Sequence, residues 1–313
     1  MPPVIDVKKV SKSFGKQPVL QDLSLEILEG DVYGLVGLNG AGKTTLIRLL
    51  LGILKPGGGS IVVLGRDPWS HDAALNRRLG VVLEHDGFWG NLTFEQNLRI
   101  FAAAKNVPWQ EAGRYLEEHW SGTALYNNKK AVKFYSRGQR MQCAICRAFL
   151  GKPDIFFFDE PVVALDVGAY EHFGGLVRAA RERGATFLIS SHQLDAIDDL
   201  CNRVGALRDK QIVELTKTGR NSVTGSTWEL VADPNARWAS LIQEVCGSAA
   251  LFRNGSWQFD VINPDTMVPE LVAKLVKAGC MVRAIAPAAS GFRESIRKEY
   301  RGRGPIQTEG GAA

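Results

Sequence analysis

The chain has 313 residues, of which 45% are hydrophobic and 23% are charged, and its formal net charge at pH 7 is +5. This length allows two modest domains with ordinary cores, and the longest apolar runs fall far short of the roughly 20 residues that cross a bilayer. The mild charge gives no reason to expect a nucleic-acid partner, and an odd number of cysteines, five, does not suggest a disulfide framework.

The start of the chain, Met1-Pro-Pro-Val-Ile-Asp, lacks the basic residues and apolar run of a secretory signal. We therefore expect a cytoplasmic protein whose cysteines are reduced. Cys143 and Cys146 form a C-x-x-C pattern, which can indicate a metal or redox site. Because they lie at positions i and i+3 of a helical run with no second cysteine pair, they are predicted to be small core residues.

Short apolar runs alternate with helical patterns through the first two thirds of the chain, which predicts an α/β domain with a largely parallel sheet. Strands are expected at residues 4–10, 31–36, 80–83, 155–159 and 186–190. Between about residues 91 and 135 the composition becomes helix-like, and Thr93 and Gln96 have the spacing of a capping box. This stretch is predicted to be an inserted helical region.

The glycine-rich stretch after the second predicted strand fits the phosphate-loop pattern G-x-x-x-x-G-K-[ST]. It follows an apolar run and precedes a helical pattern, as such a loop requires. Its glycines let backbone N–H groups curl around phosphate oxygens, and the following helix directs its positive end at them. Lys43 is predicted to reach the β and γ phosphates, and Thr44 to hold Mg²⁺. The nucleotide-binding candidates here are Gly37, Leu38, Asn39, Gly40, Ala41, Gly42, Lys43, Thr44 and Thr45.

Two acids end the apolar run Ile155-Phe-Phe-Phe, where carboxylates can emerge at the carboxyl edge of a parallel sheet. Asp159 suits the magnesium shell. Glu160 is placed to polarise an attacking water as a general base in phosphoryl transfer. Paired acids after a strand are often only helix caps, but the phosphate loop upstream favours the catalytic interpretation.

Three further stretches follow in order: Tyr135-Ser-Arg-Gly-Gln139, Val163-Ala-Leu-Asp166 and Ser190-Ser-His192. Together with the phosphate loop and the acid pair, they make the chain resemble the ATP-binding-cassette (ABC) family over roughly residues 4–213. The resemblance implies a phosphate-loop NTPase fold, α/β, with a parallel-sheet core, an inserted helical subdomain and MgATP as the substrate. We expect this ATP-binding domain at residues 1–215, with its helical subdomain at about 86–150.

The resemblance also implies roles for individual residues. Tyr135 to Gln139 corresponds to the family's signature motif, which completes the ATP site of an opposing subunit, so Ser136, Gly138 and Gln139 are expected to bind nucleotide there. Ser136 can also cap the helix that follows it. His192 corresponds to a histidine that contacts the γ-phosphate, and Phe14 to an aromatic ring that stacks on adenine.

Two positions depart from the family pattern. Glu84 stands where a glutamine normally touches Mg²⁺; it keeps an oxygen ligand but adds negative charge beside the triphosphate. Arg137 stands where the signature motif usually has glycine. These two residues leave open a regulatory cassette with weak hydrolysis. Because Glu160 and His192 are retained, working hydrolysis is the prediction.

A second unit is expected after a polar linker at residues 216–227. It offers a strand at 228–232, a helix at 236–246, two strands flanking Asn254-Gly255, a helix near 268–277 and a strand at 281–285. We therefore predict a small α+β accessory domain at residues 228–300. Phe292, Ile296 and Tyr300 have the spacing of one more amphipathic helix, and residues 301–313 are predicted to be a disordered tail.

By resemblance, the expected partners are a transmembrane permease subunit and a second ATP-binding subunit, identical or related, with no nucleic acid. The accessory domain favours an exporter, and the protein is expected to lie on the cytoplasmic face of the membrane. A coupling helix of the permease is expected near residues 84–97, where Phe88, Trp89 and Leu92 supply apolar contact. The alternative is a soluble ABC ATPase acting on ribosomes or DNA; its usual tandem cassettes, coiled-coil insertions and zinc modules are not visible in the sequence.

Overall fold

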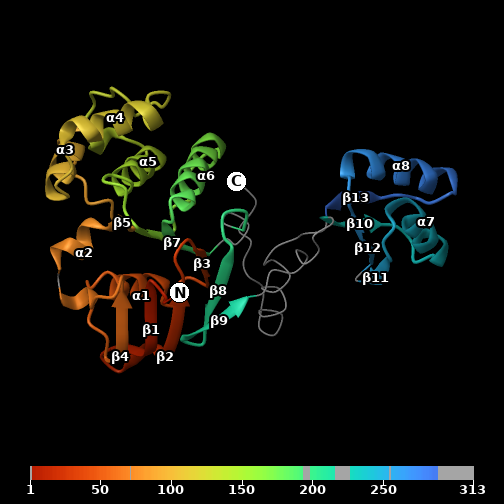
Figure 1. Ribbon diagram of the computed structural model, residues 1–313, viewed down its shortest axis with the longest axis horizontal. Helices are drawn as coiled ribbons and strands as arrows, with labels where there is room; N and C mark the ends of the chain where they lie inside the picture. The colour runs from red at the N-terminus through yellow and green to blue at the C-terminus, as the bar shows by residue number, and fades with distance from the viewer. Residues whose placement is uncertain (1, 71, 193–197, 216–225, 254, 288–313) are drawn as a thin grey trace, which may run out of the picture. The chain divides into compact units, whose positions relative to one another are not determined.

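A six-stranded sheet forms the centre of the first of two units, Met1–Leu215 and Thr216–Ala313, in this computed structural model (Figure 1). The residues described are 2–70, 72–192, 198–215, 226–253 and 255–287. The strand order is β5-β6-β7-β3-β8-β9, and every pair is parallel except β8 with β9. The predicted largely parallel sheet is confirmed. Its strands are β3 (Val32–Val36), β5 (Leu79–Val82), β6 (Ile155–Asp159), β7 (Thr186–Ser191), β8 (Arg203–Arg208) and β9 (Gln211–Leu215).

A second, antiparallel sheet of order β2-β1-β4 covers one face of this centre. Its strands are β1 (Ile5–Phe14), β2 (Gln17–Ile27) and β4 (Gly58–Val63). Between the sheets lies α1 (Lys43–Leu50), which buries Leu46, Ile47, Leu49 and Leu50 in the shared apolar core. The first strand runs four residues past its predicted end, because irregularities in its register with β2 let the pairing continue to Phe14 opposite Gln17.

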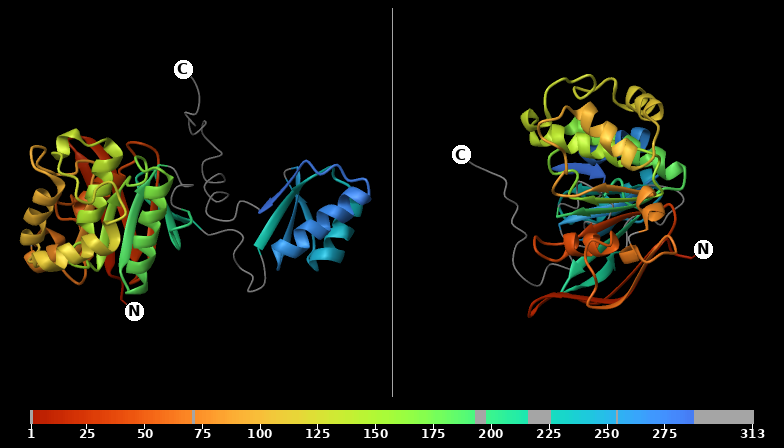
Figure 2. Two further views of the ribbon diagram at one scale, coloured as in Figure 1. Left: turned by 90° about the horizontal axis from the view of Figure 1, so that it is seen from above. Right: turned by 90° about the vertical axis from the view of Figure 1, so that its left-hand side faces the viewer.

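Helices cover the other face of the central sheet. Because side chains alternate along a strand, β6 turns Ile155 and Phe157 into the α1 core and Phe156 and Phe158 to the opposite side. There their rings contact Phe149, Phe173 and Phe187. The longer helices described after α1 in this unit lie away from the antiparallel sheet (Figures 1 and 2). They are α3 (Phe94–Ala104), α4 (Trp109–Trp120), α5 (Arg137–Ala148) and α6 (Val167–Glu182), with short turns α2 (Ala73–Arg77), η1 (Pro68–Ser70) and η2 (Val132–Phe134).

The predicted capping box is present at the start of α3. The Thr93 hydroxyl accepts from the Gln96 backbone N–H, and the Gln96 side chain accepts from the Thr93 N–H. Two of the N–H groups that a helix start leaves without partners are satisfied in this way. The helical interpretation of residues 91–135 is confirmed for α3 and α4.

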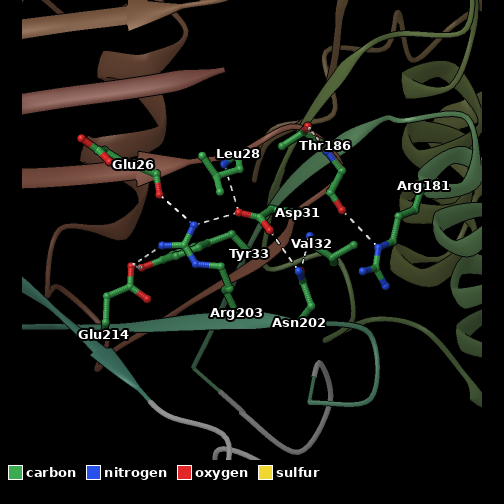
Figure 3. Close-up of polar contacts among 11 residues, drawn as sticks. Glu26, Leu28, Asp31, Val32, Tyr33, Arg181, Thr186, Asn202, Arg203 and Glu214 are labelled. Carbon is green, nitrogen blue, oxygen red and sulfur yellow. Dashed lines mark hydrogen bonds and ion pairs between the residues drawn. The ribbon is translucent and has the colours of Figure 1, made fainter. Parts of the chain in front are cut away.

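A polar network ties together the amino ends of β3 and β8 and the carboxyl end of β9 (Figure 3). The buried Asp31 accepts from Arg203 at 2.8 Å and from Asn202 at 2.9 Å, and Arg203 also pairs with Glu214 at 3.2 Å. The Tyr33 hydroxyl donates to the same Glu214 at 2.9 Å. The network holds the sheet at the end opposite to the phosphate loop, because the loop follows the carboxyl end of β3.

In the described part of the second unit, two helices lie on one face of a four-stranded antiparallel sheet (Figure 2). Its elements in chain order are β10 (Ser226–Val231), α7 (Ala236–Cys246), β11 (Leu251–Arg253), β12 (Ser256–Val261), α8 (Pro264–Lys277) and β13 (Ala284–Pro287). This βαββαβ order with sheet order β11-β12-β10-β13 is the ferredoxin-like arrangement. Leu230, Trp257 and Phe259 pack there against Trp238, Ile242, Leu271 and Leu275 of the helices.

Several boundaries differ from the sequence expectation in this unit. The strand β10 begins at Ser226, two residues earlier than expected and inside the predicted linker. The second helix begins four residues early at Pro264, because proline suits the first turn of a helix. The last strand begins at Ala284 rather than at residue 281, because the chain first turns at Gly279, whose φ is +88°. Residues 216–225 of the predicted linker at 216–227 lie outside the described residues. So do Asn254, the expected helix at Phe292, Ile296 and Tyr300, and the tail at 301–313. Of the helices described, none is long and apolar enough to span a bilayer.

Candidate nucleotide-binding site

The loop residues from Gly37 to Thr45, the acids Asp159 and Glu160, and His192 lie at or just after the carboxyl ends of three neighbouring strands, β3, β6 and β7. Ligands of open α/β sheets bind at this edge. The loop after β3 needs its glycines: Gly40 has φ +80° and Gly42 has φ +111°, where a side chain would be strained. Gly42 is the N-cap of α1, and neither a capping side chain nor an acid occupies the first helical turn. The loop from Gly37 to Thr45 therefore ends on N–H groups suited to an anion.

Lys43 is almost completely buried, with 6% of its side chain exposed. Its amine donates to the carbonyl oxygens of Gly37 at 2.8 Å and Leu38 at 3.3 Å, so the lysine is folded back over its own loop. The same nitrogen lies 3.3 Å from Glu160 Oε1. The amine is thus held above the loop, where the phosphate-loop pattern requires it.

Asp159 is 2% exposed and is fixed through both carboxylate oxygens. Thr44 Oγ1 donates to Asp159 Oδ2 at 2.7 Å, and Ser190 Oγ donates to Asp159 Oδ1 at 2.5 Å. A hydroxyl next to a carboxylate is the hard oxygen donor set that Mg²⁺ prefers, with the substrate phosphates and water completing the shell. Thr44 and Asp159 therefore fit the metal that the sequence predicts.

Glu160 lies between two partners and has an unusual backbone. Its φ is +52°, in the left-handed region that residues with a β-carbon seldom adopt and that is often found at functional sites. One carboxylate oxygen faces Lys43, and the other lies 2.7 Å from His192 Nδ1 and 3.2 Å from the His192 N–H. The structure thus joins Lys43, Glu160 and His192, the residues for which phosphate and water chemistry is predicted.

Glu84 is not joined to this cluster. The strand β5 ends at Val82, and Glu84 lies exposed two residues later. Among the described residues it makes no hydrogen bond or ion pair, whereas Thr44 and Asp159 contact each other directly.

The stretch predicted to be the signature motif, Tyr135 to Gln139, surrounds the start of α5. Ser136 is the N-cap, and Ser136 and Gln139 form a capping box whose two bonds are 3.0 and 3.2 Å long. A β-carbon on Gly138 would lie only 2.6 Å from the Ala164 carbonyl oxygen, so this glycine lets α5 approach the loop before α6. Arg137 is exposed. No hydrogen bond described here links these residues to Lys43 or Asp159.

Phe14 ends β1 with 51% of its surface exposed, and the Lys12 amine lies 5.5 Å from the centre of its ring. An exposed ring with a free face is suited to stacking on a base.

Cys143 and Cys146 are buried in α5, where burial raises the pKa of both thiols. Their predicted place in the core is confirmed.

A link that was not predicted joins the segment after β5 to the helix α5. Asp86 pairs with Arg140 through bonds of 2.6 and 3.1 Å, and its carbonyl accepts from Arg147. Burial acts to raise the pKa of Asp86, but the Arg140 bond and its neighbours lower it overall, so the carboxylate stays charged. Arg147 also lies over the Phe88 and Phe101 rings, at 5.1 and 4.7 Å from their centres. Only the spacing of two arginines seven residues apart on one helical face would have suggested this link.

Comparisons with known proteins agree with this geometry. The family model described as "ABC transporter" matches residues 20–163. The bacitracin transport ATP-binding protein BcrA of Bacillus licheniformis is 34% identical over 216 residues, which cover 68% of this chain and 70% of that protein. The Nod factor export ATP-binding protein I of Rhizobium meliloti is 33% identical over 65% of this chain and 61% of its own length. A solved structure, that of the ATP-binding subunit of an ABC transporter, matches with a TM-score of 0.64 at 27% identity, covering 68% of this chain and 90% of that one.

Proposed function

Since this chain belongs to the ATP-binding subunits of ABC transporters, which hydrolyse ATP to power a permease, we propose a role for each residue at its site. The observation that carries the proposal is the convergence of Lys43, Thr44, Asp159, Glu160 and His192 at one edge of the central sheet. The loop N–H groups and Lys43 bind the phosphates, and Phe14 stacks on the adenine.

In this proposal Thr44 and Asp159 hold Mg²⁺, which when bound neutralises phosphate charge. Glu160 orients and activates the attacking water, and His192 positions the Glu160 carboxylate while its ring faces the γ-phosphate. Lys43 exchanges Glu160 for phosphate when ATP enters, because the amine is already within 3.3 Å of that carboxylate. ATP binding therefore removes the Lys43 amine from Glu160 and leaves the Glu160 carboxylate paired with His192.

We propose that the site is completed by a second ATP-binding subunit, whose Ser136, Gly138 and Gln139 approach the γ-phosphate. The start of α5 suits this role because it carries no acid in its first turn and presents the positive end of a helix. ATP would then favour the closed pair because it bridges two surfaces, and hydrolysis would remove that bridge. The exposed Arg137 would lie at this interface.

The relatives support a permease partner and the export direction. Two of them are named for bacitracin transport and Nod factor export, which supports an exporter at the cytoplasmic face of a membrane. The permease contact would include Trp89, which is 51% exposed beside Phe88 and Phe101. Arg147 and Asp86 connect this aromatic cluster to α5, the helix that carries the signature motif.

The test is the ATPase activity of the complex assembled with its permease. We expect Glu160→Gln to lose turnover by a factor of about 100 or more, because the general base is gone. The same variant should bind ATP at least as tightly as wild type, because Lys43 loses its charged competitor for phosphate. Wild-type turnover no greater than that of Glu160→Gln would refute the catalytic proposal and favour a regulatory cassette. Co-purification with ribosomes or DNA instead of a protein with several apolar helices would refute the transport proposal.

A further inference from the structure

Ser190 connects the two strands that carry the acids and the histidine of the site. In the register of β6 with β7, Ser190 stands directly beside Asp159, and it is completely buried. The described hydrogen bonds of its side chain go to the Asp159 carboxylate and to the backbone N–H of Glu160. Any effect of Ser190 on the reaction must therefore act through those two acids.

The Ser190 hydroxyl makes two hydrogen bonds that have different effects. It donates to Asp159 Oδ1 at 2.5 Å, while Thr44 donates to Asp159 Oδ2 at 2.7 Å. One hydroxyl therefore holds each oxygen, and together they fix the rotation of the carboxylate. Without Ser190 the buried Oδ1 would lack this donor, and the carboxylate could turn away from Thr44.

The second bond acts on Glu160. Its backbone N–H donates to Ser190 Oγ at 3.0 Å and to the Ser190 carbonyl at 3.2 Å. Glu160 has a φ of +52°, and such a conformation persists only where neighbouring groups hold it. From this backbone the carboxylate reaches both Lys43 and His192.

We propose that Ser190 is a positioning residue for ATP hydrolysis: its hydroxyl orients Asp159 toward the metal and holds the strained backbone that presents Glu160. The proposal rests on the roles assigned above to Asp159 and Glu160. It predicts that removal of the hydroxyl affects turnover and the Mg²⁺ requirement more than it affects nucleotide binding by the loop.

The experiment compares Ser190→Thr with Ser190→Val in the assembled complex, because these two side chains share a shape and differ by the hydroxyl. We expect Ser190→Val to lower kcat about tenfold or more, which corresponds to about 1.4 kcal/mol, and to raise the Mg²⁺ concentration for half-maximal activity. The KM for ATP should change by less than about threefold. Ser190→Thr should recover most of kcat. Ser190→Ala adds no atom to the buried site and should behave as Ser190→Val does.

A second readout is independent of turnover. Binding of a fluorescent ATP analogue to the full chain in EDTA should be unchanged by Ser190→Ala, whereas the tightening caused by added Mg²⁺ should be reduced. The matched control is Thr186→Val, which removes another buried hydroxyl of β7, one that accepts from the Gly30 N–H at 3.0 Å at the far end of the strand. It should lower the unfolding temperature and leave kcat and the Mg²⁺ dependence unchanged.

Wild-type kcat and Mg²⁺ dependence in Ser190→Ala would overturn the proposal, as would equal losses of kcat in Ser190→Ala and Thr186→Val. The Glu160→Gln variant distinguishes a failure of the Ser190 proposal alone from a failure of the proposed function. If Glu160→Gln abolishes turnover while Ser190→Ala does not, only the role of Ser190 is wrong. If neither variant lowers turnover, the catalytic assignment of Glu160 is wrong as well.

Discussion

Replacement of Gly205 by alanine should destabilise the first unit, because the Tyr33 side chain lies directly against this glycine. The Tyr33 hydroxyl bonds to Glu214, the residue that pairs with Gly205 in the neighbouring strand; Figure 3 shows the bond. A β-carbon at position 205 would lie 2.0 Å from the Tyr33 hydroxyl oxygen and 2.9 Å from its Cζ, whereas atoms in good contact stay roughly 3.5 Å apart. The added carbon would also lie 2.8 Å from the Ile212 side chain. Tyr33 is completely buried, so its ring has no open space to enter.

The size of the effect follows from these contacts. Overpacking of a core usually costs about 1–3 kcal/mol. A displaced Tyr33 would also lose its hydrogen bond to the Glu214 carboxylate, and hydrogen bonds to charged groups contribute about 1.5–3 kcal/mol. We therefore expect Gly205→Ala to lower the free energy of unfolding by about 3 kcal/mol.

The assay is urea unfolding of the full chain, in which the transition that ATP shifts to higher urea reports the first unit. Tyr33→Phe removes the hydroxyl and its bond, and should cost about 1–3 kcal/mol alone. In the double variant the closest contact is gone, so the two losses should not add, and the double variant should be at least 1 kcal/mol more stable than their sum. A Gly205→Ala protein within about 0.5 kcal/mol of wild type, or strict additivity of the two changes, would refute this reasoning.

Three further results are expected. Burial, and secondarily Arg147, lowers the pKa of Lys105 to about 8, below its ordinary value of 10.5. Between these two pH values the unfolded chain binds more protons than the folded chain, so the contribution of Lys105 to stability rises with pH. The urea midpoint of wild type minus that of Lys105→Met should therefore increase from pH 8 to 10, and a constant difference would contradict this. Gly138→Ala should lower the unfolding temperature by several degrees and reduce turnover, because its β-carbon would clash with the Ala164 carbonyl oxygen. An unchanged unfolding temperature in calorimetry would show that the loop before α6 moves aside without cost. Ser136→Ala should lower the free energy of unfolding in urea by about 1 kcal/mol, because the α5 cap is lost. Ser136→Asp restores a capping acceptor and should recover most of this loss. Equal stability of the two variants would argue against the cap.

The high pKa of Tyr33 gives the Gly205 experiment a pH control. Burial, followed by the neighbouring Glu214, raises the pKa of Tyr33 well above its usual value of 10. The folded chain therefore keeps this proton at pH values where the unfolded chain has lost it, so the Tyr33 contribution is present below about pH 10 and declines as the pH rises above it. Tyr33→Phe should lose less stability than wild type between pH 10 and 11.

Local sequence determined the parts of this protein whose physics is local. The buried run Ile155–Asp159 forms the predicted strand, because a short, wholly apolar stretch can satisfy its backbone in the middle of a parallel sheet. The capping pairs at Thr93 and Ser136 form because their partners lie three residues away. The glycines of the phosphate loop take conformations that only glycine adopts readily. Fold class and phosphate loop were therefore both readable before any contact between distant residues was known.

The tertiary structure alone decided which distant side chains meet. The pairing of β6 with β7 puts Ser190 beside Asp159, and the neighbouring strand ends bring Glu160 to Lys43 and His192. No local pattern encodes these neighbours, because strand order and register depend on the packing of the whole unit. The left-handed backbone of Glu160 likewise has no signature in the sequence, since a glutamate adopts it only when surrounding contacts enforce it. The sequence by itself therefore determined the chemistry available to this protein, and the sheet determined which of those groups act together.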